Sequence, residues 1–162
     1  MKKAIFLDRD GTLNNMQDHY YIWRPEDFQL NPGVIETLAE LKKRGYLLVV
    51  ISNQGGVSKG EYGREDVEAL HAHMYSLLKE QGVVLDEILF CPHHPAQEAC
   101  LCRKPFPLMI QKAMARFTID PAESWMVGDS DRDVEAGKAA GLRTLKVAAN
   151  GDLRSVLDII ID

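Results

Sequence analysis

The sequence has no apolar run near the roughly 18 residues needed to cross a bilayer, and its start lacks a signal-peptide core. It also has no excess of basic residues, because 24 acidic residues outnumber 19 basic ones. Since a nucleic-acid surface needs clustered Lys and Arg, this balance argues against a nucleic-acid partner. No repeat, low-complexity tract or linker divides the 162 residues. We therefore expect a single cytoplasmic domain, residues 1–162, that acts as a monomer without a membrane or nucleic-acid partner.

Cysteine is scarce, and its placement argues against a disulfide framework. An odd number of cysteines falls within one short segment: Cys91, Cys100 and Cys102. With His93 they offer three thiolates and one imidazole, a soft donor set that favours four-coordinate Zn²⁺ with no open position. The pattern predicts a structural zinc site, and the alternative is a group of buried or free thiols.

Short β-rich runs alternate with longer helical patterns. The expected strands are Ala4–Leu7, Tyr46–Ser52, Leu85–Phe90, Ser124–Val127 and Leu142–Val147. The expected helices are Val34–Arg44, Arg64–Gln81, Pro107–Phe117 and Asp131–Ala140. His71 and His73, two apart on one of these helices, face different sides and are interpreted as surface histidines. The alternation predicts an α/β fold with a mostly parallel sheet and helices on both faces.

Carboxylates follow two of the expected strands, at the edge of the sheet where such folds gather their chemistry. Asp8 and Asp10 come directly after the first strand. Asp129 comes after the fourth, and Asp133 lies one helical turn further on. Carboxylates from two strands form an oxygen-rich site suited to Mg²⁺. Taken singly, the first pair is also compatible with an acidic surface turn, and the second with a helix cap.

Polar and basic groups follow the other strands. Ser52, Asn53 and Gln54 stand at the head of a glycine-rich loop of the kind that binds anions. Lys104, beside Arg103, offers positive charge to a phosphate. Each feature alone is also typical of an ordinary loop or a solvated surface.

Together these groups predict phosphoryl transfer. An Asp beside a magnesium ion can act as nucleophile, which splits the transfer into two easier steps. Lys104 and Ser52 would hold the phosphoryl oxygens. Asp10 would protonate the leaving alcohol and then activate water.

The segment 6–13 (FLDRDGTL), followed in order by Ser52, Lys104 and Gly128-Asp129 with Asp133, resembles the haloacid dehalogenase superfamily. The resemblance spans nearly the whole chain and implies a Rossmann-like fold. It also implies that Asp8 is the nucleophile and Asp10 the general acid/base. Asp8, the backbone carbonyl of Asp10 and Asp129 would then bind Mg²⁺, with Asp133 just outside the ligands.

The segments 91–95 (CPHHP) and 102–105 (CRKP) resemble the zinc-containing branch of this superfamily, which includes heptose bisphosphate and histidinol-phosphate phosphatases. The resemblance implies four zinc ligands: Cys91, His93, Cys100 and Cys102. The stretches 18–22 (DHYYI) and 53–60 (NQGGVSKG) are more similar to the heptose enzymes. They imply a set of contacts to a phosphorylated sugar: Asp18, His19, Tyr20, Tyr21, Ser52, Asn53, Gln54, Arg103 and Lys104. Two substrates stay open: a heptose 1,7-bisphosphate, which would lose its C7 phosphate, and histidinol phosphate.

The spacing of the motifs leaves no room for a large cap domain, so we expect an open site shielded by the zinc loop and the loop 18–23. A missing cap argues against a phosphomutase or nucleotidase. A non-catalytic, metal-stabilised binding module is a further alternative. It would have no need of Asp8 or Asp10, and both are present.

Overall fold

Five parallel strands form the centre of the protein, whose computed structural model describes residues 1–161. Their order across the sheet is β3-β2-β1-β4-β5. The bounds are β1 Ala4–Leu7, β2 Leu47–Asn53, β3 Glu87–Cys91, β4 Trp125–Gly128 and β5 Arg143–Lys146. Each strand lies within two residues of its predicted bounds, and the α/β prediction is confirmed.

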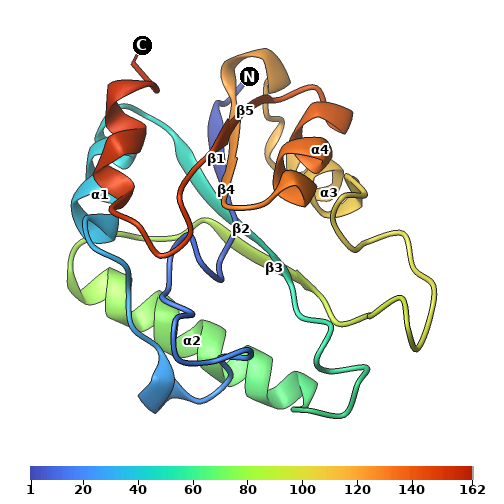
Figure 1. The fold of residues 1–162 in the computed structure, drawn as a ribbon. Coiled ribbons are helices and arrows are strands. Elements are labelled where there is room, and N and C mark those ends of the chain that lie inside the picture. Colours follow the sequence, from blue (N-terminus) through green and yellow to red (C-terminus); the bar gives the residue numbers. More distant parts are fainter. Residues whose placement is uncertain (162) are drawn as a thin grey trace.

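The four α-helices of residues 1–161 cover the two faces of this sheet (Figure 1). They are α1 Val34–Lys43, α2 Arg64–Glu80, α3 Leu108–Phe117 and α4 Asp131–Ala139. The chain adds β2 and β3 on one side of β1, then crosses back to add β4 and β5 on the other. Because parallel crossovers are right-handed, this reversal places α1 and α2 on one face and α3 and α4 on the other.

The alternation of side chains along β1 divides the core into two layers. Ile5 and Leu7 belong to the layer that includes residues of α1 and α2. Ala4 and Phe6 belong to the layer that includes residues of α3 and α4. All four side chains are almost fully buried, as expected for a central strand covered on both faces.

Three short 3₁₀ segments were not predicted, since so short a segment shows no helical periodicity. They are η1 Pro25–Asp27, η2 Pro121–Glu123 and η3 Leu153–Asp158. Figure 1 shows η3, coloured red, beside α1, and the Arg44 guanidinium at the end of α1 donates to the carbonyl of Ile160 at 2.7 Å. This contact fastens the end of the described chain to the first helix.

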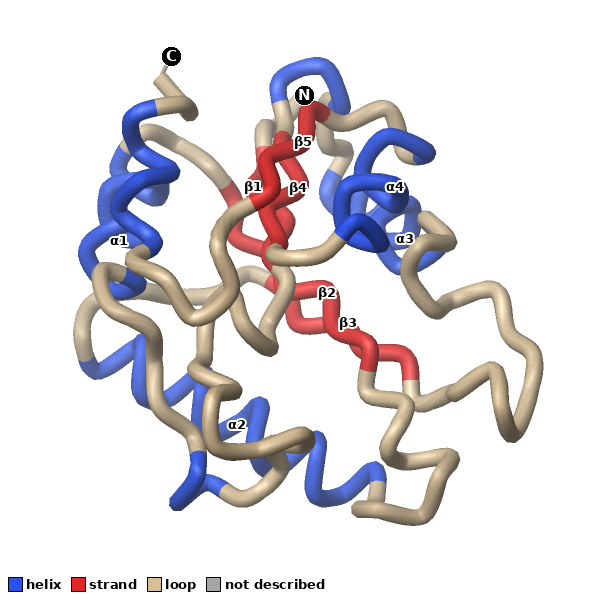
Figure 2. The backbone as a smooth tube through the Cα atoms, in the orientation of Figure 1, coloured by secondary structure: helices blue, strands red, loops and turns tan. Residues whose placement is uncertain are grey.

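Long irregular connections lie at the carboxyl edge of the sheet (Figure 2). Residues 8–33 connect β1 to α1 with only η1 inside, and residues 92–107 connect β3 to α3 without any helix or strand. Within residues 1–161 no separate cap domain interrupts the sheet. No helix in this part of the chain has the length and hydrophobicity required to span a membrane.

Candidate active site and metal centres

Asp8 lies at the end of β1, where a buried lysine reaches it from a distant loop. Lys104 Nζ donates to Asp8 Oδ1 at 2.8 Å, to Asp133 Oδ1 at 2.7 Å and to the carbonyl of Ile51 at 2.7 Å. Lys104 is only 2% exposed. The Thr12 hydroxyl lies 3.4 Å from Asp8 Oδ2. The parallel sheet thus brings Lys104 to Asp8 across 96 residues of sequence.

The charges at this point do not balance. Burial raises the pKa of Asp8 well above its usual value; Lys104 opposes that rise, while Asp133 and Asp129 add to it. Burial alone would lower the pKa of Lys104, but the two carboxylates that it contacts raise it. Three carboxylates therefore lie close together beside a single ammonium group, and the site favours an additional cation.

The donor set fits a hard divalent cation. Asp8, Asp129 and Asp133 each offer a carboxylate oxygen, and these atoms lie within 4.8 Å of one another. Asp133 is engaged by Lys104 and by Ser130, whose hydroxyl and backbone N–H donate to it. Asp129 makes no hydrogen bond or ion pair with any residue in the range 1–161, although it lines the cavity beside Asp8. Carboxylate oxygens with little other engagement are the ligands that Mg²⁺ prefers.

Two glycines allow these carboxylates to lie against the backbone. A Cβ atom on Gly11 would stand 2.2 Å from Asp129 Oδ2, and the residue also has φ +84°. A Cβ atom on Gly128 would stand 2.2 Å from Asp133 Oδ2. Neither clash could be relieved without moving a carboxylate of the site.

Asp10 is held at both carboxylate oxygens. The Arg9 guanidinium contacts Oδ1 through Nε at 2.8 Å and Nη2 at 2.7 Å. Gln54 Nε2 donates to Oδ2 at 3.2 Å and to the Ser52 hydroxyl at 2.7 Å. The Tyr62 hydroxyl in turn donates to Gln54 Oε1 at 2.7 Å. The side chain is 27% exposed and lines the same cavity as Asp8, so it can exchange a proton with a bound molecule.

Arg9 and His71 form a buried pair behind Asp10 that the sequence interpretation missed. Arg9 is fully buried and also donates to the carbonyl of Ile22 at 2.7 Å. Its Nη1 lies 3.1 Å from His71 Nε2, and His71 is only 6% exposed. The interpretation of His71 as a surface histidine was wrong, because the α2 face that carries it packs under the loop after β1. His73 is half-buried, with its ring edge-on to Phe28.

The buried pair predicts a pH-dependent stability. Burial and then the charge of Arg9 lower the pKa of His71 to about 3. At pH values between the unfolded-state pKa near 6.5 and the folded-state pKa, only the unfolded chain binds the proton. In this range the free energy of unfolding falls by about 1.4 kcal/mol for each unit by which the pH is lowered. From pH 7 to pH 5 the free energy of unfolding of the wild type should fall by up to about 2 kcal/mol more than that of His71→Gln. Urea unfolding of both proteins at both pH values is the measurement. Equal losses in the two proteins would contradict the prediction.

A cavity of about 350 Å³ opens above Asp8 and Asp10. Seven other residues singled out from the sequence line it: Tyr20, Tyr21, Asn53, Arg103, Lys104, Asp129 and Asp133. Ser52 and Gln54 lie beneath it, 1% and 2% exposed, and support Asp10. Asp18 and His19 line a separate hollow of about 130 Å³. The structure therefore brings most of the predicted site together and leaves these two outside.

The lining also includes residues that were not predicted as site residues, among them Tyr62, His94 and Arg132. Tyr62 stacks on Trp23 and meets Tyr21 edge-on, so the aromatic wall is built from two loops. Aromatic walls with a few polar groups are typical of sites for small organic molecules. The shielding expected from the 18–23 loop is provided by Tyr20 and Tyr21.

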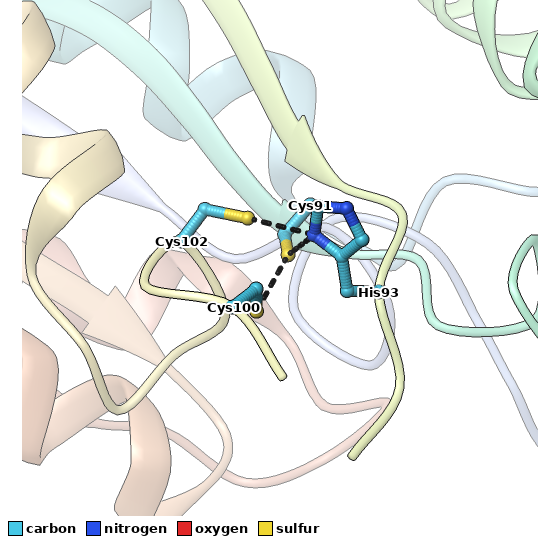
Figure 3. A group of neighbouring side chains, drawn as sticks. All are labelled: Cys91, His93, Cys100 and Cys102. Carbon is cyan, nitrogen blue, oxygen red and sulfur yellow. Dashed lines mark hydrogen bonds between the residues drawn. The ribbon is translucent and has the colours of Figure 1, made fainter. Parts of the chain in front are cut away.

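The second candidate metal centre lies at the start of the loop after β3, where four side chains converge (Figure 3). Cys91 Sγ lies 3.4 Å from His93 Nδ1 and 3.7 Å from Cys100 Sγ, and His93 Nδ1 lies 3.2 Å from Cys102 Sγ. A tetrahedral zinc ion with bonds of about 2.0–2.3 Å separates its ligand atoms by roughly 3.5–3.8 Å. Burial raises the pKa of the Cys91 thiol, so a cation would be needed to hold it as thiolate. The arrangement fits Zn²⁺.

Comparison with known proteins agrees with this geometry. Residues 101–157 match the HAD-hydrolase-like family model. The D-glycero-β-D-manno-heptose-1,7-bisphosphate 7-phosphatase of Haemophilus ducreyi is 44% identical over 156 residues, covering 93% of this chain and 85% of that protein. The enzyme of the same name from Escherichia coli K12 is 42% identical over 154 residues, covering 91% and 80%. The chain belongs to the haloacid dehalogenase-like hydrolases, in the family of these heptose bisphosphate phosphatases.

A solved structure of this family extends the match to three dimensions. The D,D-heptose 1,7-bisphosphate phosphatase from B. bronchiseptica, complexed with magnesium and phosphate, superposes with a TM-score of 0.84. It is 34% identical, and the match covers 97% of this chain and 86% of that one. The prediction of a haloacid dehalogenase-type phosphoric monoester hydrolase is confirmed, as is its Rossmann-like fold.

Proposed function

We propose that the protein is a Mg²⁺-dependent phosphatase that removes the C7 phosphate of D-glycero-D-manno-heptose 1,7-bisphosphate and leaves the 1-phosphate. The observation that carries this proposal is the cluster at the end of β1, where Asp8 meets Lys104 beside an unengaged Asp129. The names of the relatives at 42–44% identity support the choice of substrate. Histidinol phosphate remains the competing substrate.

The residues divide the reaction into two balanced steps. In the first, a carboxylate oxygen of Asp8 bonds to phosphorus, the bond from phosphorus to the sugar oxygen breaks, and Asp10 protonates the departing alkoxide. In the second, Asp10 takes a proton from water, the water oxygen bonds to phosphorus, and the carboxylate of Asp8 is released. Lys104 stays beside Asp8 throughout and offsets negative charge.

The two metals have separate roles in this proposal. Asp8, Asp129 and the backbone carbonyl of Asp10 would hold Mg²⁺, which when bound supplies positive charge to the phosphoryl group. Zinc would be held by the four side chains after β3 that are shown in Figure 3. Four protein ligands leave no position for water, so zinc would fix the loop and take no part in the reaction.

We extend the proposal to the setting of the enzyme. Thiolate zinc ligands remain reduced in the cytoplasm, which favours a cytoplasmic enzyme. We also propose that it is a monomeric single domain without a membrane or nucleic-acid partner, and the acidic charge balance of the chain supports the last of these. Light scattering of the purified protein, with a mass near 18.2 kDa expected, tests the monomer.

The substrate is tested by parallel phosphate-release assays. Both anomers of the heptose 1,7-bisphosphate and histidinol phosphate are offered at matched concentrations, with Mg²⁺ and with a chelator. We expect the heptose bisphosphate to give the highest kcat/KM and the chelator to stop turnover. A higher kcat/KM for histidinol phosphate would assign the other substrate, and hydrolysis of no ester would contradict the phosphatase.

Asp10→Asn should retain the fold and the backbone carbonyl but lose about 10²–10⁴-fold in kcat, the usual scale for general acid/base catalysis. Arg9 can still donate to the oxygen of the amide, whereas the NH₂ group cannot accept the hydrogen bond from Gln54 Nε2. A thermal midpoint close to that of the wild type therefore has to accompany the kinetic loss before the loss is assigned to proton transfer. The exposed Asp158→Asn is the matched control and should keep wild-type kcat. An Asp10→Asn enzyme with unchanged kcat would remove Asp10 from the mechanism.

A further inference from the structure

A second cavity of about 530 Å³ adjoins the one that contains Asp8. Four residues line both cavities and so form their common border: His94, Arg103, Lys104 and Arg132. Beyond this border the second cavity has mainly apolar walls, including Pro95, Ala99, Pro105 and Phe106. A molecule bound at Asp8 can therefore extend past two arginines into a less polar space.

Arg132 at this border has no anionic partner within residues 1–161. The two carboxylates that flank it in the sequence are engaged elsewhere, Asp131 by Lys146 at 2.9 Å and Asp133 by Lys104 at 2.7 Å. Among the described residues, the Arg103 guanidinium donates one hydrogen bond, to the carbonyl of His93 at 3.2 Å. Both arginines line the two cavities, and after burial the charge of Arg132 is the next cause that lowers the pKa of Arg103.

The position of Arg132 is unfavourable for the free protein. It lies in the first turn of α4, where the helix dipole disfavours a cation, and it lines the same two cavities as Arg103. An anion placed between the two guanidinium groups would relieve both repulsions and would accept hydrogen bonds in the geometry that suits phosphate. The cluster thus has the charge of an anion-binding subsite, separate from Asp8 and its carboxylates.

We propose that Arg132, together with Arg103, binds the anionic group of the substrate that is not hydrolysed, a second phosphate carried on the same sugar. This inference rests on the proposed function, because it requires a phosphate ester bound at Asp8. It assigns Arg132 a role in selecting bisphosphates over monophosphates.

The test compares two substrates that share the hydrolysed ester, heptose 1,7-bisphosphate and heptose 7-phosphate. In the wild type we expect a higher kcat/KM for the bisphosphate, through a lower KM. Arg132→Gln should reduce the ratio of the two kcat/KM values about tenfold, since it removes a charged contact to the second phosphate. Arg132→Lys should restore part of the ratio. Lys138→Gln, an exposed cation further along α4, should leave it unchanged.

The ratio of the two kcat/KM values does not change when a variant loses activity equally on both substrates. Equal loss on both substrates in Arg132→Gln, or a wild type without preference for the bisphosphate, would overturn it. If neither heptose ester is hydrolysed, the proposed substrate fails. The inference is then decided on fructose 1,6-bisphosphate against fructose 6-phosphate, where a ratio unaffected by Arg132→Gln again overturns it and a reduced ratio supports it.

Discussion

Asp8→Asn is expected to abolish turnover, with a loss of about 10⁴-fold or more in kcat. The amide has nearly the volume of the carboxylate but cannot form the phosphoenzyme, and it removes one negative charge from the magnesium ligands. Lys104 keeps Asp133 and the carbonyl of Ile51 as acceptors, so its ammonium group remains paired. Phosphate release by the purified variant is the measurement.

The Asp8 variant must be shown to be folded. Because burial makes the Asp8 carboxylate costly, the neutral amide should cost little stability, and the thermal midpoint and zinc content should match those of the wild type. Asp158→Asn, a neutralised acid on the surface, should retain full activity. Wild-type turnover in a folded Asp8→Asn protein would refute the nucleophile assignment.

The sequence was sufficient for the sheet and for the residues at its carboxyl edge. Buried strands such as β1 are local signals and were predicted correctly. Gly45, which follows α1 with φ +90°, is a local signal of the same kind, because glycine at a positive φ commonly ends a helix. The meeting of Asp8 with Lys104 follows from topology, because consecutive parallel strands end at the same edge. The four zinc-type ligands were recognisable because their spacing within one short loop limits how they can arrange.

Contacts between irregular segments were not predictable in the same way. Arg9 lies between two carboxylates in sequence, yet its side chain turns inward to His71 and becomes fully buried. The spacing of Val67, Leu70, His71 and Met74 on α2 does carry a helical signal for a buried face, and it could have placed His71 inside. For Asp18 no such signal exists, because the loop that carries it has no periodicity to show which way its side chains face.

The second large effect is expected from the zinc site. Cys102→Ser removes one of four thiolate or imidazole donors, and structural zinc stabilises a small domain by roughly 10 kcal/mol or more in favourable cases. Here the sheet folds around its own core, so we do not expect complete unfolding. We expect the loop 92–107 to become disordered and the thermal midpoint to fall. Zinc content by metal analysis should fall from about one per chain to well below one.

The effect should reach the substrate through two backbone contacts. The carbonyl of His93 accepts from Arg103 at 3.2 Å, and Asn53 at the end of β2 brackets Lys104 by accepting from its N–H at 2.9 Å and donating to its carbonyl at 3.1 Å. Loss of zinc frees the first contact and leaves the second. Cys102→Ser should therefore raise the KM for the heptose bisphosphate by a larger factor than the factor by which it lowers the kcat for a small aryl phosphate.

Leu101→Ser is the matched control, because Leu101 is 71% exposed between the two cysteines and its replacement keeps all four ligands. It should retain zinc, the thermal midpoint and the KM of the wild type. Wild-type protein that is active without zinc, with Cys91, Cys100 and Cys102 all reacting as free thiols, would contradict the zinc site. Equal behaviour of Cys102→Ser and Leu101→Ser would instead show that the loop holds Arg103 in place without a metal.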